Sequence, residues 1–176
     1  GMDHFAARGD SLHEAVCRTL ETSRRGYLKR TFNGYSPNTQ EMIGLGPTST
    51  GVLGDIYCQS HYDLNEYYAA INRREFPILR GYHMTEDDHK RRDVIFDFLC
   101  GRLVTLDREY FSEEWEKLSE MPDLCKMNFW GYEDMVNPTE LGDYLIRHIC
   151  KVFDKKDVKP EHNRIAQKQI TRKMVA

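Results

Sequence analysis

The stretch "MTEDDHKRRDVIFDFL", residues 84–99, fixes the start and the buried face of a central helix. Thr85 and Asp88 have the spacing of a capping box, in which each side chain accepts a hydrogen bond from the other residue's backbone N–H. The apolar residues that follow recur at helical spacing. We therefore predict a helix from this cap to about Arg102, with an inward face formed by Val94, Ile95, Phe98 and Leu99.

Further helices are predicted on both sides of this segment. Asp10 and Asp63 are each placed to cap a helix, because a carboxylate can accept hydrogen bonds from the free N–H groups of the first turn. The helix after Asp63 is expected to carry Leu64, Tyr67, Tyr68 and Ile71 on one face. A shorter helix near 108–121 is expected to bury Tyr110, Phe111, Trp115 and Leu118.

Strand signals occur in two places. Residues 42–54 are short apolar pieces cut by glycines, which indicates a strand running into a loop. After Pro122 the apolar period changes to 2, which predicts a two-stranded hairpin near 124–136. Asn137 and Pro138 then have the cap and first-turn positions of a long helix whose inward residues are Leu141, Tyr144, Leu145, His148, Ile149, Val152 and Phe153. The predicted fold class is mainly α with a small antiparallel β-sheet (α+β), including a helical C-terminal domain with a winged-helix-like hairpin.

Composition places the chain among globular proteins. The 176 residues are 40% hydrophobic and 30% charged, with a net charge of −3. Residues 151–176 hold eight Lys or Arg against three acidic residues, which reads as a solvated basic tail. There is no run of 18 apolar residues and no signal-peptide pattern, so a cytoplasmic location without membrane contact is predicted. The five cysteines form no zinc or iron–sulfur spacing, and we expect them to be reduced and mostly buried.

Two polar groups could suggest a metal site. His83 and His89 flank three acidic residues, but their spacing across a helix start and the helix dipole favour an ion-paired surface that includes Arg91 and Arg92. Cys58-x-x-His61 is a two-ligand fragment without visible partners. No metal site is therefore predicted.

Two further features have a structural and a functional interpretation. His148 lies on an apolar helix face, where a hydrogen-bonded core histidine is favoured over a catalytic one. The glycine run "GLGPTSTG", residues 44–51, could hold a phosphate with its N–H groups, but it matches neither dinucleotide nor Walker motifs, so turn geometry is favoured.

The segment "GYLKRTFNGYSP", residues 26–37, combines aromatic and basic residues around Asn33-Gly34, a pair that tolerates the positive φ of a tight turn. It is interpreted either as a hairpin tip with anchoring aromatics or as a loop that covers an anionic ligand. Spacing alone gives no self-contained catalytic constellation.

Several stretches, in this order, resemble the C-terminal portion of oxygen-independent coproporphyrinogen III oxidases, a radical S-adenosylmethionine family of haem biosynthesis. They span nearly the whole chain: "GMDHFA" (1–6), "FNGY" (32–35), "GLG" (44–46), "LGDIYCQ" (53–59), "YYAAI" (67–71), "RGYHMTEDDHKRRDVI" (80–95) and "IRHICKVFD" (146–154).

The resemblance implies an oxidoreductase reaction. The family decarboxylates two propionates of coproporphyrinogen III to vinyl groups, giving protoporphyrinogen IX, with S-adenosylmethionine and a [4Fe–4S] cluster held largely by an N-terminal barrel. The resemblance then implies three regions: residues 1–60 as the end of the barrel with cavity-lining loops, 61–154 as the helical C-terminal domain, and 155–176 as a basic tail. By itself the chain is expected to bind no cofactor and to be catalytically inert.

The resemblance also implies site residues. It places the substrate cavity beside Arg30, Phe32, Asn33, Gly34 and Tyr35, with basic residues suited to propionates. It aligns Thr50 with an apolar contact to S-adenosylmethionine, and a polar residue there departs from the family pattern.

Other interpretations stay open from sequence. Thr31, where the family has asparagine, and a longer segment before "FNGY" suggest a divergent member. A haem-chaperone relative and a stand-alone winged-helix module are the alternatives. The latter is disfavoured as a nucleic-acid binder, because Glu140 and Asp143 accompany only Arg147 and Lys151 on the expected recognition helix.

Overall fold

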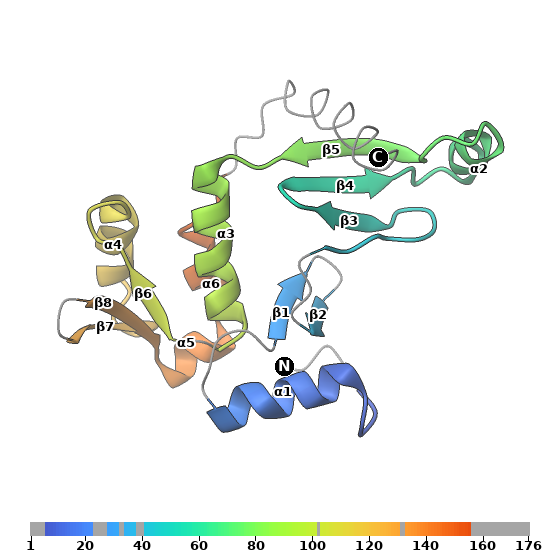
Figure 1. The fold of residues 1–176 in the computed structure, drawn as a ribbon. Coiled ribbons are helices and arrows are strands. Elements are labelled where there is room, and N and C mark those ends of the chain that lie inside the picture. Colours follow the sequence, from blue (N-terminus) through green and yellow to red (C-terminus); the bar gives the residue numbers. More distant parts are fainter. Residues whose placement is uncertain are drawn as a thin grey trace. The chain divides into compact units, whose positions relative to one another are not determined.

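The structure is a computed structural model that describes residues 6–22, 28–31, 34–37, 41–101, 103–130 and 133–155. These residues divide into two compact units, whose elements are labelled in Figure 1. One unit contains the described residues up to 37 together with 90–155, and the other contains 41–89. Within the described ranges, no helix is long and apolar enough to cross a membrane.

The unit of residues 41–89 is built on an antiparallel sheet with strand order β3-β4-β5. Its strands are β3 (Thr50–Leu53), β4 (Ile56–Ser60) and β5 (Ile78–His83). Leu53 and Ile56 are buried and pack with the partly buried Cys58 and Ile78. The strand predicted within 42–54 is present as β3, whereas β4 and β5 had no clear sequence signal.

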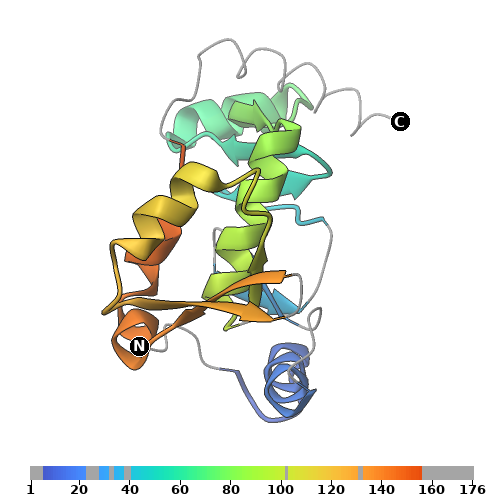
Figure 2. The same cartoon turned by 90° about the vertical axis from the view of Figure 1, so that its left-hand side faces the viewer.

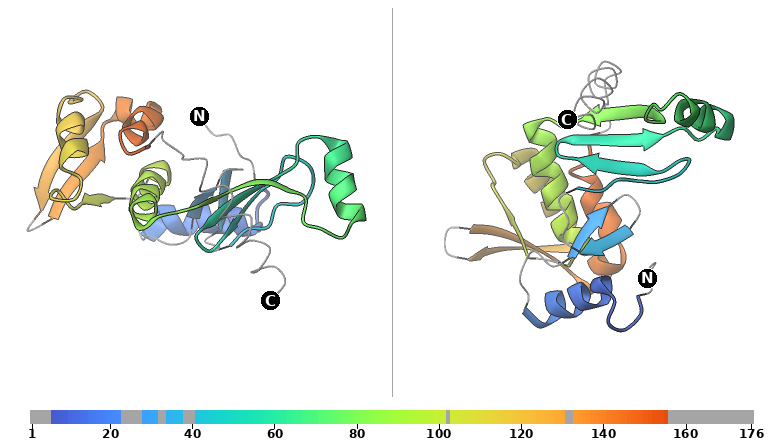
Figure 3. Two further views of the ribbon diagram at one scale, coloured as in Figure 1. Left: turned by 90° about the horizontal axis from the view of Figure 1, so that it is seen from above. Right: turned by 45° about the vertical axis from the view of Figure 1, so that its right-hand side comes forward.

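Helix α2 (Leu64–Asn72) begins where the sequence predicts, since the Asp63 carboxylate accepts hydrogen bonds from the N–H groups of Asn65 and Glu66 at 2.9 and 3.0 Å. The predicted apolar face of this helix is mostly exposed. Leu64, Tyr68 and Ile71 are exposed, and the buried residue of the helix is Ala70. Figures 1 and 3 show the reason: α2 lies at the end of the sheet rather than across its face, so little protein covers it.

The capping box of helix α3 (Glu86–Leu99) is confirmed. The Thr85 N–H donates to the Asp88 carboxylate at 2.8 Å, and the Asp88 N–H donates to the Thr85 hydroxyl at 3.2 Å. Val94 and Phe98 are buried, as predicted. The helix ends earlier than predicted because Gly101, with φ of 63°, turns the chain out of the helical conformation.

The other unit has its main core in residues 94–153. A three-stranded antiparallel sheet with order β6-β8-β7 contains β6 (Val104–Leu106), β7 (Cys125–Trp130) and β8 (Glu133–Pro138). The hairpin predicted near 124–136 is thus present, and β6 adds a strand that was not predicted. Figure 2 shows helices α3, α4 (Ser112–Ser119) and α6 (Ile146–Lys151) on one side of this hairpin.

Aromatic and aliphatic side chains fill this core. Phe153 contacts both Phe98 and Phe111, with ring centroids 5.9 and 5.6 Å apart. The buried members of the core are Val94, Phe98, Val104, Leu106, Phe111, Trp115, Leu118, Cys125, Val136, Ile149, Cys150 and Phe153. Tyr110, predicted to be buried, is exposed, and the ammonium of Lys90 lies 4.2 Å from its ring centroid.

A buried ion pair joins α3 to α4, and it corrects a prediction. Arg91 and Glu114 are only 9% and 6% exposed, and their side chains form a hydrogen-bonded ion pair at 2.7 Å. The expected ion-paired surface is therefore wrong for Arg91. Arg92 pairs with its neighbour Asp93 at 2.9 Å. The sequence places Arg91 three residues before Val94, so the inward face of α3 carries the guanidinium into the core.

The same unit includes the N-terminal elements. Helix α1 (Ser11–Thr22) begins as predicted, since the Asp10 carboxylate accepts from the Leu12 N–H at 2.8 Å. It is followed by the hairpin of β1 (Leu28–Thr31) and β2 (Gly34–Pro37). Ala15, Leu28 and Cys100 form a small buried cluster that contacts the partly buried Leu12 and Val16.

The predicted long C-terminal helix is wrong in its first half. Asn137 and Pro138 belong to β8, and Thr139 caps the next helix by accepting from the Gly142 N–H at 3.0 Å. The helical segment is divided into α5 (Glu140–Tyr144) and α6, with Leu145 between them. Leu141 and Tyr144 are consequently exposed, while Ile149 and Phe153 are buried as predicted.

The architecture is a mixture of helices and small antiparallel sheets, which confirms the predicted α+β class. The β content is spread over three small sheets, of two, three and three strands, in the described residues. The proposed regions 1–60, 61–154 and 155–176 stay a prediction.

Candidate functional site

The first candidate is the hairpin that carries "FNGY". Arg30 and Tyr35 are register partners, as are Thr31 and Gly34. Gly34 is buried in β2 with φ of 126°, a value that favours glycine. Phe32 and Asn33 lie outside the described residues. The hairpin interpretation is therefore confirmed for the strands, and the backbones of Arg30 and Tyr35 lie side by side; the role of these residues toward a ligand stays a prediction.

The second candidate is the glycine run before β3. Its glycines are explained by close packing: a Cβ on Gly44 would lie 2.3 Å from the Thr50 carbonyl oxygen, and one on Gly51 would lie 2.9 Å from the Cys58 sulfur. Gly46 has φ of 96°, and Thr48 has the unusual φ of 62°. This geometry is that of a tight turn next to a sheet edge.

Two N–H groups of this turn donate hydrogen bonds within the protein. The Thr48 N–H donates to the His61 carbonyl at 2.9 Å, and the Ser49 N–H donates to the Gly46 carbonyl at 3.4 Å. These bonds favour the turn interpretation over a phosphate cradle. Thr50 is the first residue of β3, is half-buried, and has Gln59 as its register partner.

An apolar feature beside this turn was missed by the sequence reasoning. Ile43 and Leu45 alternate along the chain with Met42 and Gly44, and both are exposed. The exposed fraction of Leu45 is 89%. Met42 pairs with Val52 through backbone hydrogen bonds of 2.8 and 2.7 Å, which extends the sheet beside β3. The alternation of exposed residues at 43 and 45 was visible in the sequence as an apolar, glycine-separated pattern.

The polar cluster of residues 80–93 separates into distinct local contacts. His83 pairs with Asp55 at 2.9 Å between Nε2 and Oδ2. The Tyr82 hydroxyl donates to Asp88 at 2.6 Å, and burial together with this carboxylate raises the pKa of Tyr82 to about 12. Burial opposes ionisation of Asp88, but hydrogen bonds from Tyr82 and Thr85 outweigh it and lower the pKa of Asp88. These contacts explain the cluster as strand and helix-start structure.

The residues that the structure describes include no group of three or more His, Cys, Asp or Glu arranged to hold a metal ion. Burial raises the pKa of Cys58 and Cys125, and raises that of Cys150 to about 12. Since metal ligation requires the thiolate, these environments disfavour it.

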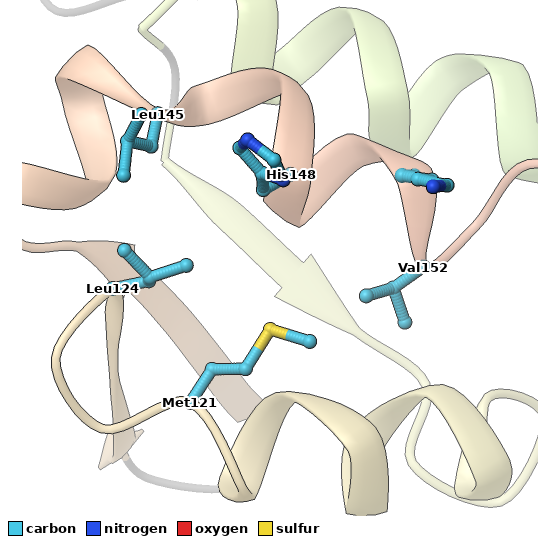
Figure 4. Close-up of a pocket in the computed structure, with 6 residues that line it drawn as sticks. Met121, Leu124, Leu145, His148 and Val152 are labelled. Carbon is cyan, nitrogen blue, oxygen red and sulfur yellow. The ribbon is translucent and has the colours of Figure 1, made fainter.

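His148 corrects a prediction. It is exposed, not a core histidine, and it lines an open cavity of about 500 Å³. Figure 4 shows its ring on α6 facing the Met121 and Leu124 side chains across the gap. The lining residues are Met121, Leu124, Leu145, His148, Lys151 and Val152. The sequence did not reveal the break between α5 and α6 at Leu145, nor that Leu145 and the imidazole are exposed.

No protein-family model matches the chain. Oxygen-independent coproporphyrinogen III oxidase from Pseudomonas aeruginosa is 31% identical over 168 residues, which cover 88% of this chain and 34% of that protein. The enzymes of the same name from Synechocystis and Escherichia coli are each 32% identical, over the same shares of the two chains. The chain therefore spans about a third of the length of these curated relatives.

A solved structure agrees with the sequence matches. Coproporphyrinogen III oxidase (HemN) from Escherichia coli, a radical SAM enzyme, superposes with a TM-score of 0.70 at 31% identity. The match covers 88% of this chain and 36% of that one.

Proposed function

We propose, from the premise that this chain is a divergent relative of the oxygen-independent coproporphyrinogen III oxidases, that it serves as the C-terminal portion of such an enzyme. The observation that carries the proposal is the agreement of the two comparisons. The fold matches the Escherichia coli radical SAM enzyme at a TM-score of 0.70, and identity of about 31% extends over 88% of the chain. The relatives' names favour the oxidase over the haem-chaperone alternative.

The described residues do not fit an iron–sulfur cluster. A [4Fe–4S] cluster is held by cysteine thiolates, whereas Cys125 and Cys150 are buried with raised pKa values and no described group of ligands gathers around them. The cluster and most contacts to S-adenosylmethionine are therefore assigned to an N-terminal barrel on the same or another polypeptide. The chain by itself is expected to be inert.

Within that enzyme, two features are assigned to the substrate cavity. The β1–β2 hairpin would supply Arg30 and Tyr35, which are register partners, together with Phe32, Asn33 and Gly34. Arg30 suits a propionate because a guanidinium pairs with a carboxylate in a bidentate geometry. Thr50 would stand where the family has an apolar contact to S-adenosylmethionine, and its half-buried position at the start of β3 supports a packing role there.

The remaining assignments follow from the same proposal. The substrate is coproporphyrinogen III, the product is protoporphyrinogen IX, and the partner is the N-terminal barrel. We place the enzyme in the cytoplasm, a reducing compartment in which cysteine thiols and iron–sulfur clusters stay reduced.

The test begins with the DNA upstream of the codon for Gly1. A reading frame that continues into a barrel with a Cys-x₃-Cys-x₂-Cys motif supports the proposal, and a stop codon with no barrel gene nearby contradicts it. The protein from the full frame is then assayed anaerobically with coproporphyrinogen III, S-adenosylmethionine and a reductant, and protoporphyrin is measured after oxidation. Turnover is expected from the full protein and none from the 176-residue chain, so turnover by this chain alone would overturn the division of roles.

A further inference from the structure

The groove between α6 and the segment of residues 121–124 is lined by apolar side chains and by two basic side chains of α6. Met121, Leu124, Leu145 and Val152 form an apolar lining, and His148 and Lys151 stand one helical turn apart on α6. None of the six lining residues is acidic. Figure 4 shows the His148 ring directed into the gap above Met121.

We infer that this groove binds a tetrapyrrole by one propionate-bearing edge; the inference rests on the proposed function and adds a site on α6 to it. The apolar lining matches the alkyl and pyrrole surface of such a ring. The ammonium of Lys151 pairs with the propionate carboxylate, and the His148 ring donates a hydrogen bond to it.

Charge fixes the orientation of the ligand. Glu120 and Asp123, which neighbour the lining residues Met121 and Leu124 in the chain, are both exposed. A propionate pointing toward them would be repelled, whereas one pointing toward Lys151 is attracted. The carboxylate edge therefore faces α6, and the apolar edge lies over Met121 and Leu124.

Size and exposure agree with a small-molecule occupant. The volume of about 500 Å³ lies within the roughly 300–1,000 Å³ of small-molecule sites. Leu145 is exposed although it belongs to the apolar lining, and a bound ring would cover it.

The test uses the 176-residue chain and coproporphyrin III, the stable oxidised tetrapropionate, with its fluorescence followed at increasing protein concentration. Saturable binding is expected. Lys151→Gln should weaken it about tenfold, because a charge-assisted hydrogen bond to the carboxylate is lost. Leu145→Glu puts a second negative charge into the groove beside the propionate and should abolish binding. Lys126→Gln changes an exposed lysine on β7 that does not line the groove, and its dissociation constant should stay within about twofold of the wild-type value.

Two further probes separate the source of the affinity. A tetracationic N-methylpyridyl porphyrin has the ring without the carboxylates and should not compete. Dodecanoate has a carboxylate on an acyl chain; if it binds in a Lys151-dependent way and coproporphyrin III does not, the tetrapyrrole assignment is wrong. Absence of saturable binding, or equal affinity in wild type and the Lys151 and Leu145 variants, also overturns it. Circular dichroism of each variant verifies that it is folded.

Failure of this inference is distinguishable from failure of the proposed function. If the full-frame protein is active and its activity is unchanged by Leu145→Glu, the groove assignment falls alone. If the chain binds coproporphyrin III through Lys151 but the full-frame protein does not turn over the substrate, the oxidase proposal falls and the site on α6 stands.

Discussion

The two units of the molecule differ in how much of their stability they hold within themselves. Residues 90–155 enclose a core of twelve buried residues with contacting aromatic rings and a buried ion pair. Residues 41–89 bury a cluster of only two, Leu53 and Ile56, and leave apolar side chains on α2 and at 43 and 45 exposed. A small sheet with one thin core layer is marginal by itself. The difference teaches that the first unit is self-supporting, while the second buries a small cluster and leaves many of its apolar side chains exposed.

The largest expected effect is in the core of the first unit. Phe153 is fully buried and contacts both Phe98 and Phe111. Phe153→Ala should lower the free energy of unfolding of this unit by about 4 kcal/mol, through lost burial and a cavity. Both tryptophans, Trp115 and Trp130, lie in this unit, so their fluorescence during urea unfolding follows it selectively. Tyr144→Ala, at a side chain that is 77% exposed, is the control and should change little; equal losses in both variants would contradict a self-supporting core.

The second effect concerns the buried ion pair. Glu114→Gln removes the carboxylate that pairs with the Arg91 guanidinium in the core and should cost about 3 kcal/mol in the same urea experiment. Asp93→Asn removes an ion-pair partner of Arg92 in a partly exposed pair and should cost less than about 1 kcal/mol.

A double variant separates ionic from packing contributions. Arg91→Met with Glu114→Leu should recover most of the stability lost in Glu114→Gln, because both charges are then absent from the core. If the double variant is less stable than the single one, the pair contributes through its hydrogen bonds rather than through charge compensation.

The third prediction addresses the weaker unit. Ile56 is fully buried but belongs to a small cluster. Ile56→Ala should reduce protection of the β4 and β5 amides against hydrogen exchange by an amount corresponding to about 2 kcal/mol, the low end for such a truncation. Protection of β7 and β8 should be unchanged, since the two cores are separate clusters. A uniform loss across all strands would show that the chain unfolds as a single cooperative unit and would break the comparison.

The features that could be predicted from the sequence are those that depend on residues close together along the chain. The caps at Asp10, Asp63 and Thr85 with Asp88 were predicted correctly, because each involves residues two or three positions apart. The β7–β8 hairpin was also predicted, from its period of 2. What depends on tertiary packing was not predicted. Helix α2 has an apolar helical pattern, but most of that face is exposed. The C-terminal helix is interrupted at Leu145, although the apolar period continues through it.

The candidate site shows the same difference between features set by local sequence and features set by tertiary packing. Local pattern located the "FNGY" hairpin, and resemblance assigned it to a cavity. The groove at His148 escaped sequence reasoning, because an apolar helical period gives the same signal for a buried face and for an open groove. The buried face and the open groove are distinguished only by the position of the 121–124 segment, which the hairpin that follows it places opposite α6.

The smallest expected effect is at the start of α3, in the second unit. Asp88 accepts hydrogen bonds from the Thr85 N–H and from the Tyr82 and Thr85 hydroxyls. Asp88→Asn should therefore cost about 1 kcal/mol at neutral pH, the typical value of a helix cap.

Burial raises the pKa of Asp88 and these hydrogen bonds lower it, with a net lowering from the model-peptide value of 3.8. A depressed carboxyl pKa contributes stability above the unfolded-state value and loses it as the pH falls through the folded-state value. The difference in hydrogen-exchange protection between wild type and Asp88→Asn should accordingly be constant above about pH 4 and shrink below it. Asp87→Asn removes a charge from the same turn without removing this acceptor, so a similar loss with it would mean that the helix dipole, not the capping box, supplies the stability.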